Sequence, residues 1–147
     1  MHLAADELWT CPACGHRFVT KNMWHSCSNF TLESHFERCT PQVRATFDAF
    51  LAVVEACGEV VVIPQKTRIA IQAQVRFARC VVRRNWLLTH LWLTRRVLHP
   101  RLTRTEKFGD KSYGHHFRFD APADIDADFS HLVAEAYRVG LREHLDR

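Results

Sequence analysis

Glycine is scarce in this chain, and several signatures of catalysis and membrane insertion are missing. Only 5 of the 147 residues are Gly, and neither a glycine-rich phosphate loop nor a Gly-x-Ser-x-Gly motif is present. No apolar run approaches the roughly 20 residues that a membrane-spanning helix needs. The chain does not begin with the charged and then apolar segments of a secretory signal peptide. We therefore expect a cytoplasmic protein that uses none of these chemistries and does not enter membranes.

The composition is that of a globular and mildly basic protein. Hydrophobic residues make up 47% of the chain, and 20 Lys and Arg oppose 16 Asp and Glu, for a net charge of +4. This balance permits an anionic partner without requiring one. Because no catalytic motif is recognisable, the sequence favours a binding role over an enzymatic one.

The amino-terminal segment carries four residues spaced as ligands of a metal ion. Cys11 and Cys14 form a Cys-x-x-Cys pair, and His25 and Cys27 follow as a second pair. Zinc prefers four thiolate or imidazole ligands in a tetrahedron, and a reducing cytoplasm favours a metal over a disulfide. With four protein ligands no position stays open for water. We therefore expect a structural Zn²⁺ bound by Cys11, Cys14, His25 and Cys27.

The fourth zinc ligand has alternatives. His35 lies on the next expected helix and could replace His25 by folding back, and Cys39 is a more distant choice. Cys57 and Cys80 have apolar neighbours, so we interpret them as buried small hydrophobic residues outside the metal site.

Hydrophobic periodicity predicts an α+β fold. Apolar residues recur at helical spacing from Pro41 to Val54, and Gly58 is typical of a helix end. A closing helix is expected from residue 120 to residue 141. Between the helices, short or alternating apolar segments predict strands at 60–63, 67–72, 75–81, 86–94, 102–108 and 113–119.

Strands in series between terminal helices are typical of an antiparallel sheet packed by helices on one face. We expect about five to six strands, with the N- and C-terminal helices on the same side. Residues 1–39 would form a zinc-knuckle-like element with a short helix, and residues 40–147 the α+β domain.

The alternation also predicts which side chains lie on the face that the helices leave open. In the strand at 75–81, it places one set on the helix side (Val75, Phe77, Val81) and the other on the open side (Arg76, Ala78, Cys80). Over all strands, the polar and aromatic residues expected on the open side are Arg68, Arg76, His90, Trp92, His116 and Arg118. Cationic side chains beside an indole ring suit an anionic ligand with a flat part, such as a nucleotide.

The segment before the second strand adds a further candidate. Lys66 and Arg68 at a strand opening could grip a phosphate or a carboxylate. The competing interpretation of this corner, and of the whole open face, is a solvated surface that only keeps the protein soluble.

Three functions follow from these residues. The preferred hypothesis is a zinc-containing binding module that takes nucleic acid or another anionic ligand on the basic and aromatic sheet face. The alternative is a small-molecule-binding protein or small enzyme, with His90 or His116 as acid or base and Lys66 or Arg68 holding the substrate. A purely protein-interaction role would be indicated by a large exposed apolar patch.

Segments spread over nearly the whole chain resemble an uncharacterised bacterial family. The most specific of these segments are WHSC, PQKTRIA and HPR, and WTCPACGHRF is similar as well. The family is known only as domain of unknown function fifty-six fifty-five. The resemblance implies one compact unit with a zinc-binding amino-terminal piece, which here would use Cys11, Cys14, His25 and Cys27. It implies no activity.

Overall fold

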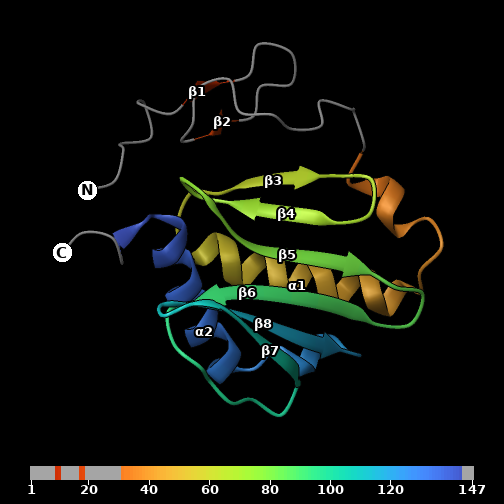
Figure 1. The fold of residues 1–147 in the computed structure, drawn as a ribbon. Coiled ribbons are helices and arrows are strands. Elements are labelled where there is room, and N and C mark those ends of the chain that lie inside the picture. Colours follow the sequence, from red (N-terminus) through yellow and green to blue (C-terminus); the bar gives the residue numbers. More distant parts are fainter. Residues whose placement is uncertain (1–8, 11–16, 19–30, 144–147) are drawn as a thin grey trace.

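A six-stranded antiparallel sheet, covered by two helices on one face, makes up most of the chain (Figure 1). This computed structural model describes residues 9–10, 17–18 and 31–143. The fold confirms the predicted α+β class, the number of strands and the placement of both helices on the same side. In the described part of the chain, no helix is long and apolar enough to cross a membrane.

The six strands follow the expected segments closely. They are β3 (Val61–Pro64), β4 (Ile69–Gln72), β5 (Arg76–Val82), β6 (Leu87–Leu93), β7 (Leu102–Gly109) and β8 (Ser112–Phe119). Their order in the sheet is β3-β4-β5-β6-β8-β7, so β8 lies between β6 and β7. Both β3 and β7 are edge strands. Pro64 ends β3 at an edge, where a missing backbone N–H interrupts no interior ladder.

Helix α1 (Pro41–Cys57) begins and ends where the sequence predicts. Pro41 occupies the first helical turn, and Gly58 ends the helix with a φ of 149°, a backbone conformation that favours glycine. The buried side of α1 meets the sheet and α2 through a cluster of aromatic and aliphatic side chains. Its fully buried members include Phe47, Phe50, Phe117 and Phe129.

The closing helix starts later than its sequence pattern indicates. Residues Pro122–Asp124 form a short 3-10 helix, and α2 proper spans Ala127–Gly140. Asp126 adopts an extended backbone conformation and accepts a hydrogen bond from the Phe129 N–H at 2.8 Å. This N-cap satisfies a free donor of the first turn, which explains why the helix begins here and not at residue 120.

A β-bulge in β5 overturns part of the predicted facing of the strands. Ile71 pairs with Ala78, but the next residue, Gln72, pairs with Arg76, so Phe77 is the extra residue. Alternation is therefore reset within β5, and Cys80 is fully buried in the core. The predicted grouping of Cys80 with the open side, and of Val81 with the helix side, is wrong because one inserted residue exchanges the faces.

Two short strands near the amino terminus form a separate ladder. β1 (Trp9–Thr10) pairs antiparallel with β2 (Arg17–Phe18). In the main domain, the short 3-10 helix η2 (Glu33–Phe36) precedes α1, and Leu32, Phe36 and Cys39 pack against the core.

A buried histidine links the loop before β7 to the start of α2. The Arg101 N–H donates to His99 Nδ1 at 3.0 Å, so Nε2 carries the proton and donates to Asp126 at 3.0 Å. The His99 side chain is only 2% exposed. Because Asp126 also caps α2, this imidazole holds the cap in place.

We predict that His99→Ala lowers the free energy of unfolding by about 2 kcal/mol, because it removes two hydrogen bonds made by a buried imidazole. Urea unfolding followed by circular dichroism measures the loss. His131→Ala is the matched control, since His131 is exposed on α2. Equal and small effects of the two substitutions would contradict the role given to His99.

Candidate anion-binding face

Cross-strand pairing brings cationic and imidazole side chains into one row on the face that the helices leave open. Arg79 on β5 pairs with His90 on β6, and His90 pairs with His116 on β8. His116 in turn lies opposite Arg104 on β7. Since directly paired residues share a face, the row crosses four neighbouring strands.

Two adjoining hollows lie on this open face. The histidine-side hollow has a volume of about 450 Å³ and is lined by Thr67, Arg68, Arg79, Val81, Arg83, Leu88, Thr89, His90 and His116. The tryptophan-side hollow has a volume of about 480 Å³ and is lined by Gln65, Lys66, Thr67, Arg68, Ala70, Arg76, Ala78, Arg79 and Trp92. Thr67, Arg68 and Arg79 belong to both. The shared residues place the two hollows side by side, and together they are called the depression.

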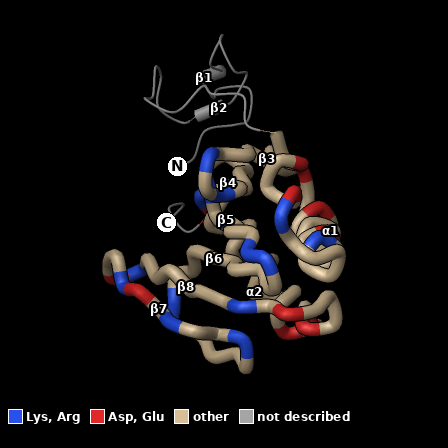
Figure 2. Tube along the Cα trace, turned by 90° about the vertical axis from the view of Figure 1, so that its right-hand side faces the viewer, with Lys and Arg blue, Asp and Glu red and all other residues tan. Residues whose placement is uncertain are grey.

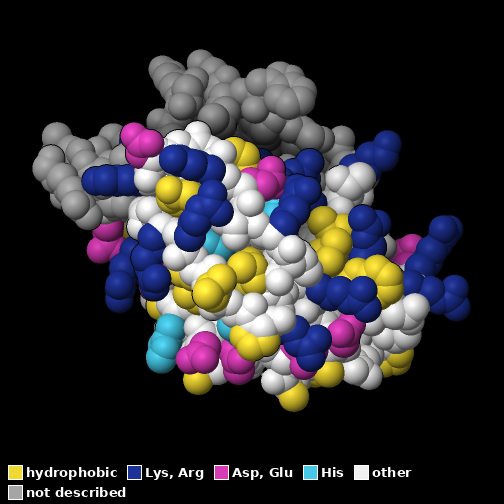
Figure 3. Space-filling model, turned by 60° about the horizontal axis from the view of Figure 1, so that its bottom comes forward, with side chains coloured by type: hydrophobic (Ala, Val, Ile, Leu, Met, Phe, Trp, Pro, Cys, Tyr) yellow, Lys and Arg dark blue, Asp and Glu magenta, His cyan; other side chains and the backbone are white. Residues whose placement is uncertain are grey.

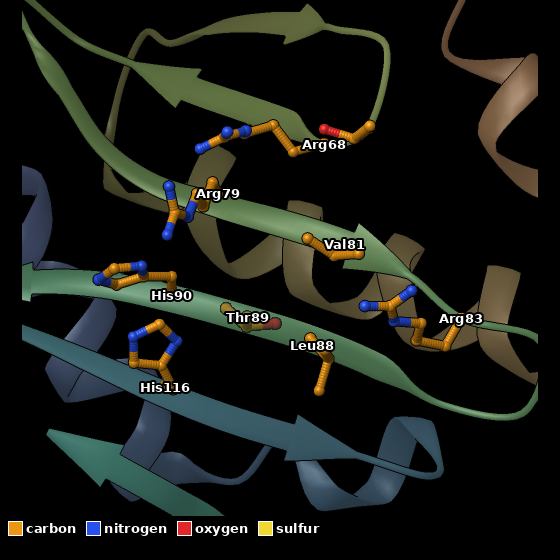
Figure 4. Close-up of a pocket in the computed structure, with 9 residues that line it drawn as sticks. Arg68, Arg79, Val81, Arg83, Leu88, Thr89, His90 and His116 are labelled. Carbon is orange, nitrogen blue, oxygen red and sulfur yellow. The ribbon is translucent and has the colours of Figure 1, made fainter.

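The side chains of the histidine-side hollow converge, as the close-up shows. In Figure 4, the guanidinium of Arg79 points toward His90, and the ring of His116 faces His90 from the neighbouring strand. Arg68 reaches over from the start of β4 toward the same region. Burial, followed by repulsion from Arg68, lowers the pKa of Arg79. Arginine nevertheless stays protonated in proteins, so the hollow keeps its positive charge.

The positive charge of the hollows has no acidic counterpart among their lining residues. From Val60 to Thr105 the chain contains no Asp or Glu, so all 16 acidic residues lie elsewhere. Figure 2 shows acidic residues on and next to α1, near the start of α2 and on β7. In Figure 3, Lys and Arg side chains gather over much of the visible surface, with hydrophobic side chains exposed between them. This separation leaves the depression suited to an anion.

His90 is the residue of this row whose polar atoms lack hydrogen bonds. It is 3% exposed, and neither ring nitrogen has a hydrogen-bond partner. Its ring stacks on Trp92 and packs against His116, with both centroid separations 4.1 Å. Burial, followed by the nearby His116 and Arg79, lowers its pKa from 6.5 to about 3. The buried imidazole is therefore neutral at physiological pH.

His116 is held by a carboxylate and has one ring nitrogen left over. Its Nε2 lies 2.6 Å from Glu106 Oε1, which also accepts from Arg104 at 2.6 Å. The His116 hydrogen bond, followed by that of Arg104, lowers the pKa of Glu106. In Figure 4 the second nitrogen of His116 is turned toward the hollow. A carboxylate-oriented imidazole can bind an anion or transfer a proton.

The structure brings six of the seven residues predicted for the ligand face together. The residues that line the two hollows are Lys66, Arg68, Arg76, His90, Trp92 and His116. Arg118 is on the same face but lies outside them. Its guanidinium carbon is 4.0 Å from the ring centroid of Trp86, and it donates to Asp120 at 3.2 Å.

Arg79 and Arg83 are lining residues that the strand pattern missed. The bulge at Phe77 turns Arg79 to the open side, and Arg83 follows in the turn after β5. The sequence does carry a signal for these two arginines, namely the segment from Val60 to Thr105, which contains no acidic residue. Between Glu59 and Glu106 the chain carries only basic charged residues, namely Lys66, Arg68, Arg76, Arg79, Arg83, Arg84, Arg95, Arg96, Arg101 and Arg104.

The predicted zinc ligands Cys11, Cys14, His25 and Cys27 lie outside the described residues. His35 is described, and its Nε2 is buried without a hydrogen-bond partner. Within residues 31–143 and the two short strands, no group of three or more His, Cys, Asp or Glu is arranged to hold a metal.

Comparison with known families places the open face in a defined domain. The sequence model of one family, described as a domain of unknown function (DUF5655), matches residues 32–140. The chain is a member of this family. No curated protein and no solved structure matches the chain. The DUF5655 match contains every residue that lines the two hollows and begins after the four predicted zinc ligands. The family description assigns no activity to the residues that line the hollows.

The neutral state of His90 predicts that the DUF5655 domain loses stability in acid. Its pKa is about 6.5 when unfolded and about 3 when folded, so its contribution is complete above pH 6.5 and falls as the pH approaches 3. Between about pH 7 and pH 4 we expect a loss on the order of 3 kcal/mol from this group. Urea unfolding at both pH values measures the loss.

His90→Phe is the control for acid sensitivity, because it keeps a buried ring and removes the titrating nitrogens. Other groups, including the buried His115, whose pKa burial also lowers, titrate in both proteins. The difference between the two losses therefore isolates His90. Equal acid losses in wild type and variant would show that His90 does not cause the effect.

Proposed function

We propose that this chain is a binding module that takes single-stranded nucleic acid across the open face of its sheet. The observation that carries the proposal is the depression, whose lining residues include five basic side chains and no Asp or Glu. The five are Lys66, Arg68, Arg76, Arg79 and Arg83. A phosphate chain is the common biological anion long enough to use both hollows together.

The tryptophan-side hollow offers contacts for the flat part of a nucleotide as well as its phosphate. Trp92 is partly exposed, and the Arg79 guanidinium carbon lies 5.4 Å from the centroid of its ring. Phe108 on β7 is 58% exposed. Proteins that bind single strands combine a basic groove with aromatic side chains on which bases stack. Both components are present on this face.

We predict salt-dependent binding of oligothymidylate, because each neutralised phosphate releases counterions. The measurement is fluorescence anisotropy with a labelled oligonucleotide over a salt series, compared with duplex DNA of the same length. Arg79→Ala should weaken binding about tenfold and reduce the salt slope by about 1. Arg79 is suited to this test because it belongs to both hollows.

Arg138→Ala is the matched control for this measurement. Arg138 is exposed on α2, which packs against the opposite face of the sheet. Its replacement removes the same charge from the protein and should change binding far less. Absence of binding at low salt, a salt slope near zero, or equal effects of the two substitutions would reject the proposal.

A second candidate function is a small enzyme, and the His116–Glu106 pair favours it. The 2.6 Å contact orients the imidazole as in many general bases, and Arg68 and Arg79 could hold an anionic substrate beside it. The salt series separates the two candidates. An enzyme acting on a small molecule would show no strong, salt-dependent affinity for oligonucleotides.

We also propose that the segment before the domain binds one structural zinc ion through Cys11, Cys14, Cys27 and a histidine. Two observations support this. The ladder of β1 and β2 flanks residues 11–16, which contain the Cys-x-x-Cys pair, as in zinc-binding hairpins. His35 Nε2 is buried without a partner, which makes His35 a stronger alternative to His25 than its sequence position indicates.

We predict one zinc ion per purified chain, measured by elemental analysis. Cys11→Ser and Cys27→Ser should each lose it, because three ligands bind zinc far more weakly than four. Of His25→Ala and His35→Ala, the one that loses zinc identifies the fourth ligand.

Cys39→Ser is the control for zinc content and should retain the metal. The Cys39 thiol already donates to the Phe36 carbonyl at 3.4 Å. A wild-type protein without zinc, or zinc retained in both cysteine variants, would reject the site.

A further inference from the structure

His90 is exceptional among the buried histidines of this domain. His99 and His115 are also buried, and each uses both ring nitrogens in hydrogen bonds. His115 accepts from the Val97 N–H at 3.1 Å and contacts the Tyr113 carbonyl at 3.2 Å. His90 is 3% exposed and has no hydrogen bond at all. Buried polar atoms without partners destabilise a fold, so this residue calls for an explanation.

The residues around His90 pack against its ring but form no hydrogen bond with its nitrogens. Trp92 and His116 cover its two sides, and Gly114 leaves room for its Nε2 edge. A Cβ built on Gly114 would lie 2.4 Å from His90 Nε2 and 2.8 Å from a Phe108 ring carbon. Both groups crowd the same point, so the Phe108 ring lies near the Nε2 edge of His90.

Phe108 is well placed to move away from this edge. It is 58% exposed and belongs to edge strand β7, where the pairing with β8 shifts register between Lys107 and Gly109. Few contacts hold a half-exposed ring on an irregular edge. Displacing the ring would leave more room at the Nε2 edge of His90, which already lines the histidine-side hollow.

We infer that His90 hydrogen-bonds a nucleobase of the bound strand once the Phe108 ring has moved aside. This inference rests on the proposed function. A neutral imidazole has one donor and one acceptor, and the Watson–Crick edge of every base also carries donors and acceptors. In this arrangement Arg68 and Arg79 bind the phosphate groups, and the uncharged imidazole of His90 binds the base. Base stacking on Trp92 or Phe108 would accompany the contact.

The test uses His90→Phe and His90→Leu, which remove the nitrogens and keep an apolar group in the core. We expect a higher urea midpoint at neutral pH, because no polar atom is left without a partner. We expect affinity for an oligothymidylate of about ten nucleotides to fall about tenfold. An abasic oligonucleotide of equal length should bind wild type and variants equally, since its phosphate contacts are unchanged.

Nitrogen NMR of the wild-type protein gives an independent readout. The His90 ring signals should shift with oligothymidylate and stay in place with the abasic strand. His131→Phe is the control, because His131 is an exposed residue of α2. It should leave the urea midpoint and both affinities unchanged.

The possible failures are distinguishable. If the wild type binds neither oligonucleotide, the proposed function and this inference both fail. If it binds, but neither His90 variant raises the midpoint or both bind oligothymidylate as tightly as the wild type, only the role of His90 is overturned.

Discussion

The register between β6 and β8 is the constraint on which the rest of the structure depends. It sets Leu87, Thr89, Leu91 and Leu93 opposite Phe119, Phe117, His115 and Tyr113 on the helix side. The same register sets His90 opposite His116 on the open side. Because successive side chains of a strand point to opposite faces, a slip of one residue would expose the core and bury the imidazole row.

Charge is separated in this domain to match the two faces of the sheet. Strands β3 to β6 carry no acidic residue, whereas the two helices carry Asp48, Glu55, Asp128 and Glu135. Arg68, Arg76 and Arg79 lie near one another, and burial followed by repulsion from Arg68 lowers the pKa of the last two. Concentrating like charges is unfavourable for folding, and an anionic ligand would relieve that cost.

Much of the fold and part of the site could be predicted from local patterns. The helix at 41–57 was recognisable from its apolar spacing, its proline and its terminal glycine, all of which act within one segment. His90, Trp92 and His116 were found because alternation holds in β6 and β8, and Lys66 and Arg68 because two cations stand at the opening of a strand. Arg79 was missed since a bulge in β5 adds one residue and reverses the alternation after it.

By itself, the sequence determined the fold class, the approximate strands and helices, and the basic character of the open face, because these follow from periodicity and composition. Only the tertiary structure decided the contacts between strands. Glu106 meets His116, and Gly114 leaves room for His90 beside Phe108, although Gly114 and Phe108 are distant from His90 in sequence. Such contacts depend on register and strand order, which no local pattern encodes.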